Sequence, residues 1–344
     1  MSDYLLAEGF GPFKDGVHTQ GSDIEVIGQW ASYAQDFSLT DKGDGRKWLT
    51  SAGSTVAIGL ASTAWTTTAT ISVCFRLFAG TRHRTELFQL RDGASFIGFI
   101  SIDTSGQIYY NIGEFGIRGM TAGVLATSTP VALGVSTHVE VRITLHNSTG
   151  TVKIYLDGVL TADESGLDTI SNGASCTSIL FNEFSAFYGF RVGWKITDII
   201  FHKSSTPVGV LRVPFVIDDA AGTDADFTPS AGSNEDNVDE IGPDEDATYN
   251  SSETPGDRDG FTGDGLALGD IKTVLHYVRA RKEAAGAATL LIGALHGGSE
   301  DQSAEKAVTE TYSNLTEFFD TCPSTAAAWS AAEVAAAENT MEVG

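Results

Sequence analysis

Residues 139–158, VEVRITLHNSTGTVKIYLDG, alternate apolar and polar side chains on both sides of a short polar stretch. Successive side chains of a β-strand point to opposite faces, so this alternation predicts an antiparallel hairpin with one buried face and one face in water. Glu140 and Arg142 fall on the water side, and Asn147–Gly150 and Asp157-Gly158 supply turn residues. The buried positions are Val139, Val141, Ile143, Leu145, Val152, Ile154 and Leu156.

The chain up to residue 203 continues as a series of short strands. Val, Ile, Phe and Thr recur in short runs, and turn signals such as Asp92-Gly93 and Ser105-Gly106 separate them. Strands at this spacing without helical segments between them are typical of an antiparallel sandwich. The predicted strands are 71–78, 85–92, 96–103, 107–112, 178–184 and 194–203.

A boundary between two domains is predicted after Thr206. Residues 218–270 then carry sixteen acidic side chains and one basic one, Arg258. This composition alone favours disorder, but aromatic residues recur through it and favour long loops attached to a core. The aromatic residues are Phe215, Phe227, Tyr249 and Phe261.

The last part of the chain returns to predicted strands, at 270–282, 288–297 and 311–323. Ser330 and Glu333 have capping-box spacing, which predicts a helix over 330–339 with Trp329 packed at its start. We therefore expect an all-β protein of two tandem β-sandwich domains, residues 1–206 and 207–344, with a short C-terminal helix.

The charge of the chain restricts its partners. Its 344 residues include 45 acidic and 21 basic side chains, for a formal net charge of −24. Such a field repels phosphate backbones and anionic lipids, so neither nucleic acid nor membrane is expected as a partner. No signal peptide or apolar run of membrane-spanning length is evident, which favours synthesis and assembly in the cytoplasm. Cys74, Cys176 and Cys322 form no CxxC pair, so neither a zinc site nor a disulfide framework is indicated.

The runs ISVCFRLF, LFQLRDG, FIGFISIDTSGQIYY and VEVRITLHNSTGTVKIYLDGVL resemble the concanavalin A-like lectin/glucanase (laminin-G-like) jelly-roll superfamily. The second half carries PSAGSNEDNVDE, DATYNSSETPGDRDGF, VLHYVRARKEAAGAATL and CPSTAAAWSAAEVAAAE in that order. With these runs the whole chain resembles virion proteins of tailed bacteriophages in which a second β domain follows the jelly roll.

That resemblance implies a structural virion protein of the tail fibre, tail tip or baseplate that recognises host-surface glycans. It also implies neighbouring virion proteins and further copies of the chain, expected as a trimer, as partners. A capsid decoration protein or head fibre, a free carbohydrate-binding module and a polysaccharide-degrading tailspike are the alternatives. The chain departs from its relatives at Thr197 and Asp198, where an Asp-Asp pair is common, and at Phe227, where Trp is common.

No catalytic residues are predicted. Glucanases of this fold place paired carboxylates on one strand, about 5 Å apart in retaining enzymes. Glu25, Glu140 and Glu183 have no partner at that spacing and are interpreted as solvent-facing charges. The histidines, among them His138, His146, His276 and His296, show no metal-binding spacing and are interpreted as hydrogen-bonded or exposed.

No cofactor is expected, and calcium is the ion that the sequence favours. Ca²⁺ takes hard oxygen ligands, which the acidic loops supply, although no EF-hand pattern is present. The candidate ligands are Asp224, Asp226, Asp244 and Asp246, with Asp236 and Asp239 nearby. Glycans would stack on exposed aromatic rings, for which Tyr109, Tyr188 and Trp194 are candidates, with Tyr110 beside the first.

Overall fold

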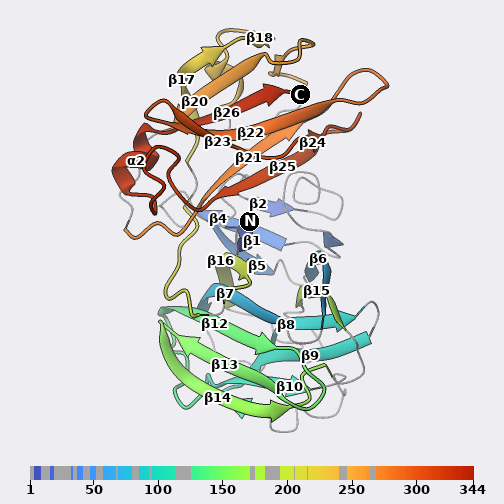
Figure 1. Ribbon diagram of the computed structural model, residues 1–344. Helices are drawn as coiled ribbons and strands as arrows, with labels where there is room; N and C mark the ends of the chain where they lie inside the picture. Colours follow the sequence, from blue (N-terminus) through green and yellow to red (C-terminus); the bar gives the residue numbers. More distant parts are fainter. Residues whose placement is uncertain are drawn as a thin grey trace.

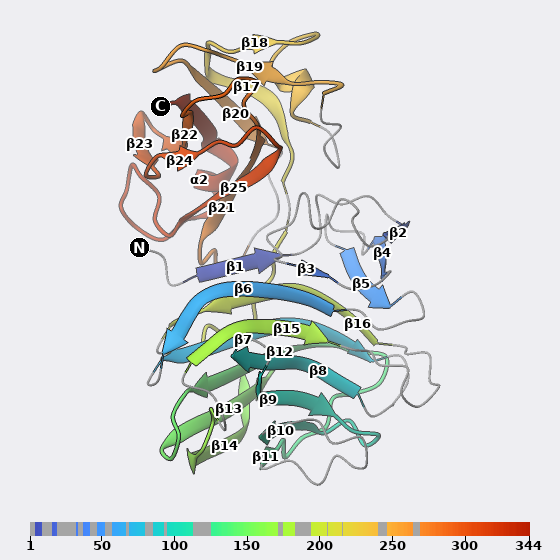
Figure 2. The same ribbon diagram turned by 90° about the vertical axis from the view of Figure 1, so that its right-hand side faces the viewer.

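The structure is a computed structural model. It describes residues 4–8, 16–18, 32–33, 37–41, 47–51, 57–66, 69–79, 85–92, 95–112, 125–170, 175–182, 194–204, 206–214, 216–239, 246–263 and 269–344. Figures 1 and 2 show two β domains stacked end to end. The end of the first domain nearest the second carries β1 (Tyr4–Glu8), β2 (Gly16–His18), β3 (Ser32–Tyr33), β4 (Phe37–Asp41) and β5 (Lys47–Ser51). Among the described residues, no helix has both the length and the apolar character needed to cross a membrane.

The first domain is a sandwich of two antiparallel sheets. The larger has nine strands in the order β14 (Val159–Leu167), β13 (Gly150–Leu156), β12 (Ser136–Thr144), β7 (Thr70–Ala79), β16 (Trp194–His202), β5 (Lys47–Ser51), β4 (Phe37–Asp41) and β2 (Gly16–His18), with β1 (Tyr4–Glu8) also on β16. The smaller has seven: β11 (Leu125–Ala126), β10 (Ile108–Ile112), β9 (Ser95–Ile102), β8 (Thr85–Asp92), β15 (Ser175–Asn182), β6 (Ala57–Thr66) and β3 (Ser32–Tyr33).

The hairpin prediction is confirmed in its pairing and in its buried face. β12 pairs with β13 from Val139–Leu156 to Thr144–Thr151, and every predicted apolar position is buried. Asp157 and Gly158 both adopt positive φ, 48° and 81°, as the turn into β14 requires. These apolar side chains meet the seven-stranded sheet in one core, where Phe75 and Phe88 pack edge to face at 6.2 Å.

The second domain is built on a six-stranded sheet. Its order is β17 (Asp218–Ala225), β20 (Arg258–Gly263), β26 (Glu338–Val343), β22 (Thr289–His296) and β23 (Ser299–Gln302), with β24 (Lys306–Ala307) also on β22. The pair β21 (Val274–Ala280) and β25 (Ser313–Phe319) packs against β22, and β18 (Thr228–Pro229) pairs with β19 (Asn250–Ser251). The core between the layers includes Ile292, Phe319 and Trp329.

The prediction for the acidic stretch, residues 218–270, was wrong in part. The acidic stretch was predicted as loops, but it forms β17 and β20 of the six-stranded sheet, and buried Phe227 and Phe261 attach it to the domain. Tyr249 is 40% exposed, and Phe215 lies outside the described residues.

The predicted helix 330–339 is shorter in the structure. The capping box of Ser330 and Glu333 is present, but α2 spans only Ala331–Ala336. Residues from Glu338 onward pair on both sides, with β20 and β22, because this strand fills the middle of the sheet. Trp329 is buried before α2, as predicted, and its indole N–H donates to the carbonyl of Phe319 at 2.8 Å.

Candidate functional site: a polar layer under the connecting segment

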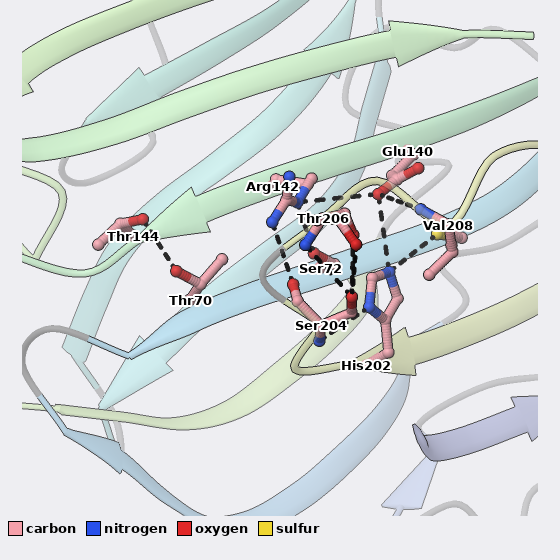
Figure 3. A network of polar contacts seen from close by, with 10 residues as sticks. Thr70, Ser72, Glu140, Arg142, Thr144, His202, Ser204, Thr206 and Val208 are labelled. Atoms are coloured by element: carbon pink, nitrogen blue, oxygen red, sulfur yellow. Dashed lines mark hydrogen bonds and ion pairs between the residues drawn. The ribbon is translucent and has the colours of Figure 1, made fainter. Parts of the chain in front are cut away.

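The outer face of the nine-stranded sheet, away from the sandwich core, carries a layer of buried charged groups. They project from the neighbouring strands β7, β12 and β16. The prediction that Glu140 and Arg142 face water was wrong, because Glu140 is fully buried and Arg142 is 8% exposed. The layer consists of these groups together with neutral neighbours on the same face: Cys74, Arg76, Ser136, His138, Glu140, Arg142, Thr197, Asp198 and His202 (Figure 3 shows part of it).

The cover over this layer is the chain that joins the two domains. Residues 203–217, called here the connecting segment, run from β16 to β17, and the predicted domain boundary after Thr206 lies within them. Leu211, with Val208 and Val213 beside it, packs on the sheet residues Cys74 and Ile200. The segment thereby adds a small apolar cluster on a face that would otherwise meet water.

Polar contacts fix the connecting segment to the same layer. The backbone N–H groups of Ser204, Val208 and Val213 donate to His202 Nδ1 (3.2 Å), Glu140 Oε1 (3.4 Å) and Asp198 Oδ1 (3.1 Å). In the opposite direction, Arg142 donates to the carbonyl of Ser204 at 3.0 Å (Figure 3). These four backbone groups of the segment therefore meet charged or polar side chains of the first domain.

The charges within the layer are paired. Arg76 Nε lies 3.2 Å from Asp198 Oδ2, and Glu140 Oε1 lies 3.8 Å from Arg142 Nε and 3.7 Å from His202 Nε2. Asp198 has a φ of 52° and sits in a register shift of β16 between Thr197 and Ile200. This irregularity turns its carboxylate toward both Arg76 and the connecting segment.

Several polar atoms in the layer have no hydrogen-bond partner among the described residues. They are Ser136 Oγ, both ring nitrogens of His138, Glu140 Oε2 and Thr197 Oγ1. The interpretation of His138 as a hydrogen-bonded or exposed imidazole was therefore wrong, since it is also fully buried. Burial, reinforced by Arg76 and His202, lowers the pKa of His138 from its ordinary 6.5 to about 4.

We expect His138→Leu to be as stable as the wild type at pH 7 and to resist acid better. The pKa of His138 is lower in the folded than in the unfolded state, so the unfolded chain takes up the proton first as the pH falls from 6.5 toward 4. The wild type therefore loses stability over this range, and the leucine variant does not lose this part. A pKa depression of this size corresponds to about 3 kcal/mol at most. Urea unfolding of both proteins between pH 4 and 7 measures the difference. A variant that is markedly less stable at pH 7 would contradict the absence of a partner for the ring.

One part of the layer offers donor atoms suited to a metal. Cys74 Sγ, Glu140 Oε1 and His202 Nε2 come from β7, β12 and β16, are fully buried and lie within 4.8 Å of one another. Cys74 Sγ is 3.6 Å from His202 Nε2, and burial raises the pKa of its thiol well above the ordinary value. Cys74 is buried as predicted, but the sequence did not reveal its polar neighbours, which lie 66 and 128 positions away in the chain.

The predicted calcium ligands are engaged by cationic, hydroxyl or backbone N–H groups where the structure describes them. Asp224 lies 3.5 Å from Arg258 Nε, and Asp226 accepts the Arg258 backbone N–H. Asp246 accepts from Arg281 at 2.9 Å and from the Tyr312 hydroxyl at 2.8 Å. Asp244 lies outside the described residues, and the calcium site stays a prediction.

Of the aromatic candidates for glycan binding, the structure describes only one side chain. Tyr109 is partly buried, and its hydroxyl donates to Asp103 Oδ2 and Gln107 Oε1. Tyr110 is a fully buried core residue. Tyr188 and the side chain of Trp194 lie outside the description, as do Glu25 and Glu183.

The three other histidines singled out from the sequence, His146, His276 and His296, have hydrogen-bond partners. His146 Nδ1 accepts the N–H groups of Ser148 and Thr149 in the hairpin turn, and buried His276 donates to the Gly293 carbonyl. His296 Nδ1 lies 2.6 Å from Ser324 Oγ and 3.3 Å from Cys322 Sγ. Cys322 is fully buried, so this group stabilises the loop after β25 and offers no accessible thiol.

Comparisons with known proteins find only distant structural likenesses. No protein-family model matches the chain, and no curated protein does. An endo-β-1,4-glucuronan lyase from the fungus Trichoderma reesei is similar over 52% of this chain and 93% of its own, with 14% identity and a TM-score of 0.39. The Emp46p carbohydrate recognition domain covers 52% of this chain and 89% of its own, with 10% identity and a TM-score of 0.35. A sialidase is similar over 59% of this chain, with 11% identity and a TM-score of 0.37, but the match spans only 19% of the sialidase. With TM-scores below 0.5, these likenesses carry no argument about the family or the activity of this chain.

Proposed function

We propose that this protein is a structural component of a tailed-phage virion, in the tail fibre, tail tip or baseplate. In this role it presents rigid β-sandwich surfaces to neighbouring proteins and to host-surface glycans, without turnover. The observation that carries the proposal is the connecting segment, which is built into the outer face of the first domain. Buried ion pairs and backbone hydrogen bonds hold this segment on the first domain, which supports a role in presenting fixed surfaces.

Exposed apolar side chains on the first domain support a role in contacts. Val159 and Leu160 begin the edge strand β14 and are 64% and 44% exposed. Val210 of the connecting segment is 49% exposed and lies beside Gly158, where a Cβ would be 3.8 Å from its methyl group. Apolar groups that gather in water mark protein contacts more often than other surface does. We propose further copies of the chain, as a trimer, and neighbouring virion proteins as the partners.

The location in the particle is the direct test. Mass spectrometry of purified particles is expected to detect the chain, and immunogold labelling to place it at the tail. Labelling of the head would favour the decoration-protein or head-fibre alternative, and absence from mature particles would refute the proposal.

Glycan recognition and the absence of turnover have separate tests. Binding of the full chain to host capsular or lipopolysaccharide glycans is expected without release of new reducing ends. New reducing ends would show a polysaccharide-degrading tailspike instead, and failure to bind any host glycan would remove that part of the proposal. Sedimentation equilibrium at several concentrations tests the trimer.

A further inference from the structure

We propose that Cys74, Glu140 and His202 form a binding site for one divalent metal ion of the zinc class. A thiolate, an imidazole and a carboxylate are the three ligand types that zinc takes in proteins. They project from three adjacent strands on one face, where β7 aligns Glu140 opposite Cys74 and His202 opposite Ser72. The sheet itself therefore holds the donor atoms together.

The distances between donor atoms suit a tetrahedral ion. Bonds of about 2.0–2.3 Å at tetrahedral angles place neighbouring donors about 3.3–3.6 Å apart. The S–N separation is 3.6 Å, the N–O separation is 3.7 Å, and all three donor atoms lie within 4.8 Å of one another, so the donor set must contract on binding. The N–O contact is long for a hydrogen bond, since N–H···O bonds are normally about 2.9–3.0 Å.

A second observation is the free oxygen of the same carboxylate. Glu140 Oε2 is buried and has no hydrogen-bond partner among the described residues. A buried carboxylate oxygen without a donor is costly, and coordination of the Glu140 carboxylate to a metal ion would offset that cost. Three side chains would then supply the protein ligands, and the positive ion would balance the thiolate and the carboxylate.

Metal binding requires that the ring proton of His202 and the thiol proton of Cys74 move. His202 Nδ1 accepts the Ser204 N–H, so the neutral ring carries its proton on Nε2, which faces Cys74 and Glu140. On binding, Nε2 gives its lone pair to the metal, the ring proton moves to Nδ1, and the Cys74 thiol releases its proton to solvent. No electrons are transferred, and the Ser204 amide must turn away from Nδ1. The metal and this one contact of the connecting segment therefore exclude each other.

The test is metal stoichiometry of the full chain refolded with zinc, measured by mass spectrometry after removal of free ions. One equivalent is expected for the wild type and for Cys176→Ser, and background for Cys74→Ser. Cys176 is the matched control, because it is an equally buried free thiol in the other sheet. Circular dichroism establishes that each variant is folded.

Refolding with cobalt supplies a second readout on the same proteins. A thiolate-to-cobalt charge-transfer absorption is expected in the wild type and Cys176→Ser and not in Cys74→Ser. A folded wild type with background zinc and no such absorption overturns the proposal, as does equal binding by both variants. Neither result bears on the location of the chain in the particle.

Discussion

Asp198→Asn lowers the free energy of unfolding of the first domain by about 3–5 kcal/mol, the range for removal of one partner of a buried ion pair. The variant leaves Arg76 beside a neutral group and weakens the acceptor of the Val213 N–H. Asparagine tolerates the positive φ of this position, so the change isolates the charge from backbone strain. Urea unfolding followed by circular dichroism measures the loss.

The matched control for this substitution is Asp163→Asn in the same sheet. Asp163 pairs with Lys153 at 2.8 Å, but both side chains are exposed, at 45% and 37%. Exposed pairs contribute about 1 kcal/mol or less. Equal losses for Asp198→Asn and Asp163→Asn would show that the layer beneath the connecting segment contributes no more than a surface ion pair.

Asn234→Ala has the second large expected effect, a loss of about 3 kcal/mol from the second domain, above the cost of a typical unsatisfied neutral group. The side-chain amide of Asn234 donates to both carboxylate oxygens of Asp259, at 2.9 and 2.8 Å, and to the carbonyl of Phe227. Asp259 is fully buried and keeps only backbone donors, including the Phe227 N–H, in the variant. Glu253→Gln, at an exposed position of the same stretch, is the control.

The pH dependence of the Asn234→Ala loss identifies its cause. Burial raises the pKa of the Asp259 carboxyl, and removal of the amide raises it further, because that hydrogen bond favours the charged form. A group with a raised folded-state pKa contributes stability at low pH that is lost as the pH rises through that pKa. The variant is therefore expected to lose less at pH 4 than at pH 7. A loss independent of pH would assign the effect to packing.

The sequence predicts the first domain well because its signal there is local. In β12 and β13 the period of two is set by side chains next to one another in the chain, and the turn residues lie between them. The covered outer face could not be predicted in the same way. Alternation shows which residues share a face, and it does not show that a segment some 60 residues downstream returns to cover it.

The acidic strands illustrate a different reason for failure. β17, DDAAGTDA, has few apolar side chains and reads as a loop. Its place in the sheet depends on close backbone approach to β20, since a Cβ on Gly222 would lie 2.5 Å from the Gly260 carbonyl carbon. Arg258 then pairs with carboxylates from three other strands, Asp224, Glu300 and Glu342. Tertiary pairing of this kind leaves no periodic pattern.

The candidate metal ligands escaped prediction for a similar reason. Zinc sites that can be recognised in a sequence have short fixed spacings between their ligands. Cys74, Glu140 and His202 come from strands whose neighbours in the sheet are distant in the chain, so only the strand order brings them together. Their residue types were visible, but their proximity was not.

Hydrogen exchange at the backbone amides of Val208 and Val213 tests most directly whether the connecting segment is part of the first domain. These amides donate to Glu140 and Asp198, so we expect them to exchange as slowly as amides of the neighbouring strands and to gain speed together in Asp198→Asn. Exchange at the rate of an unstructured linker, unchanged by the substitution, would contradict a connecting segment that is fixed to the first domain.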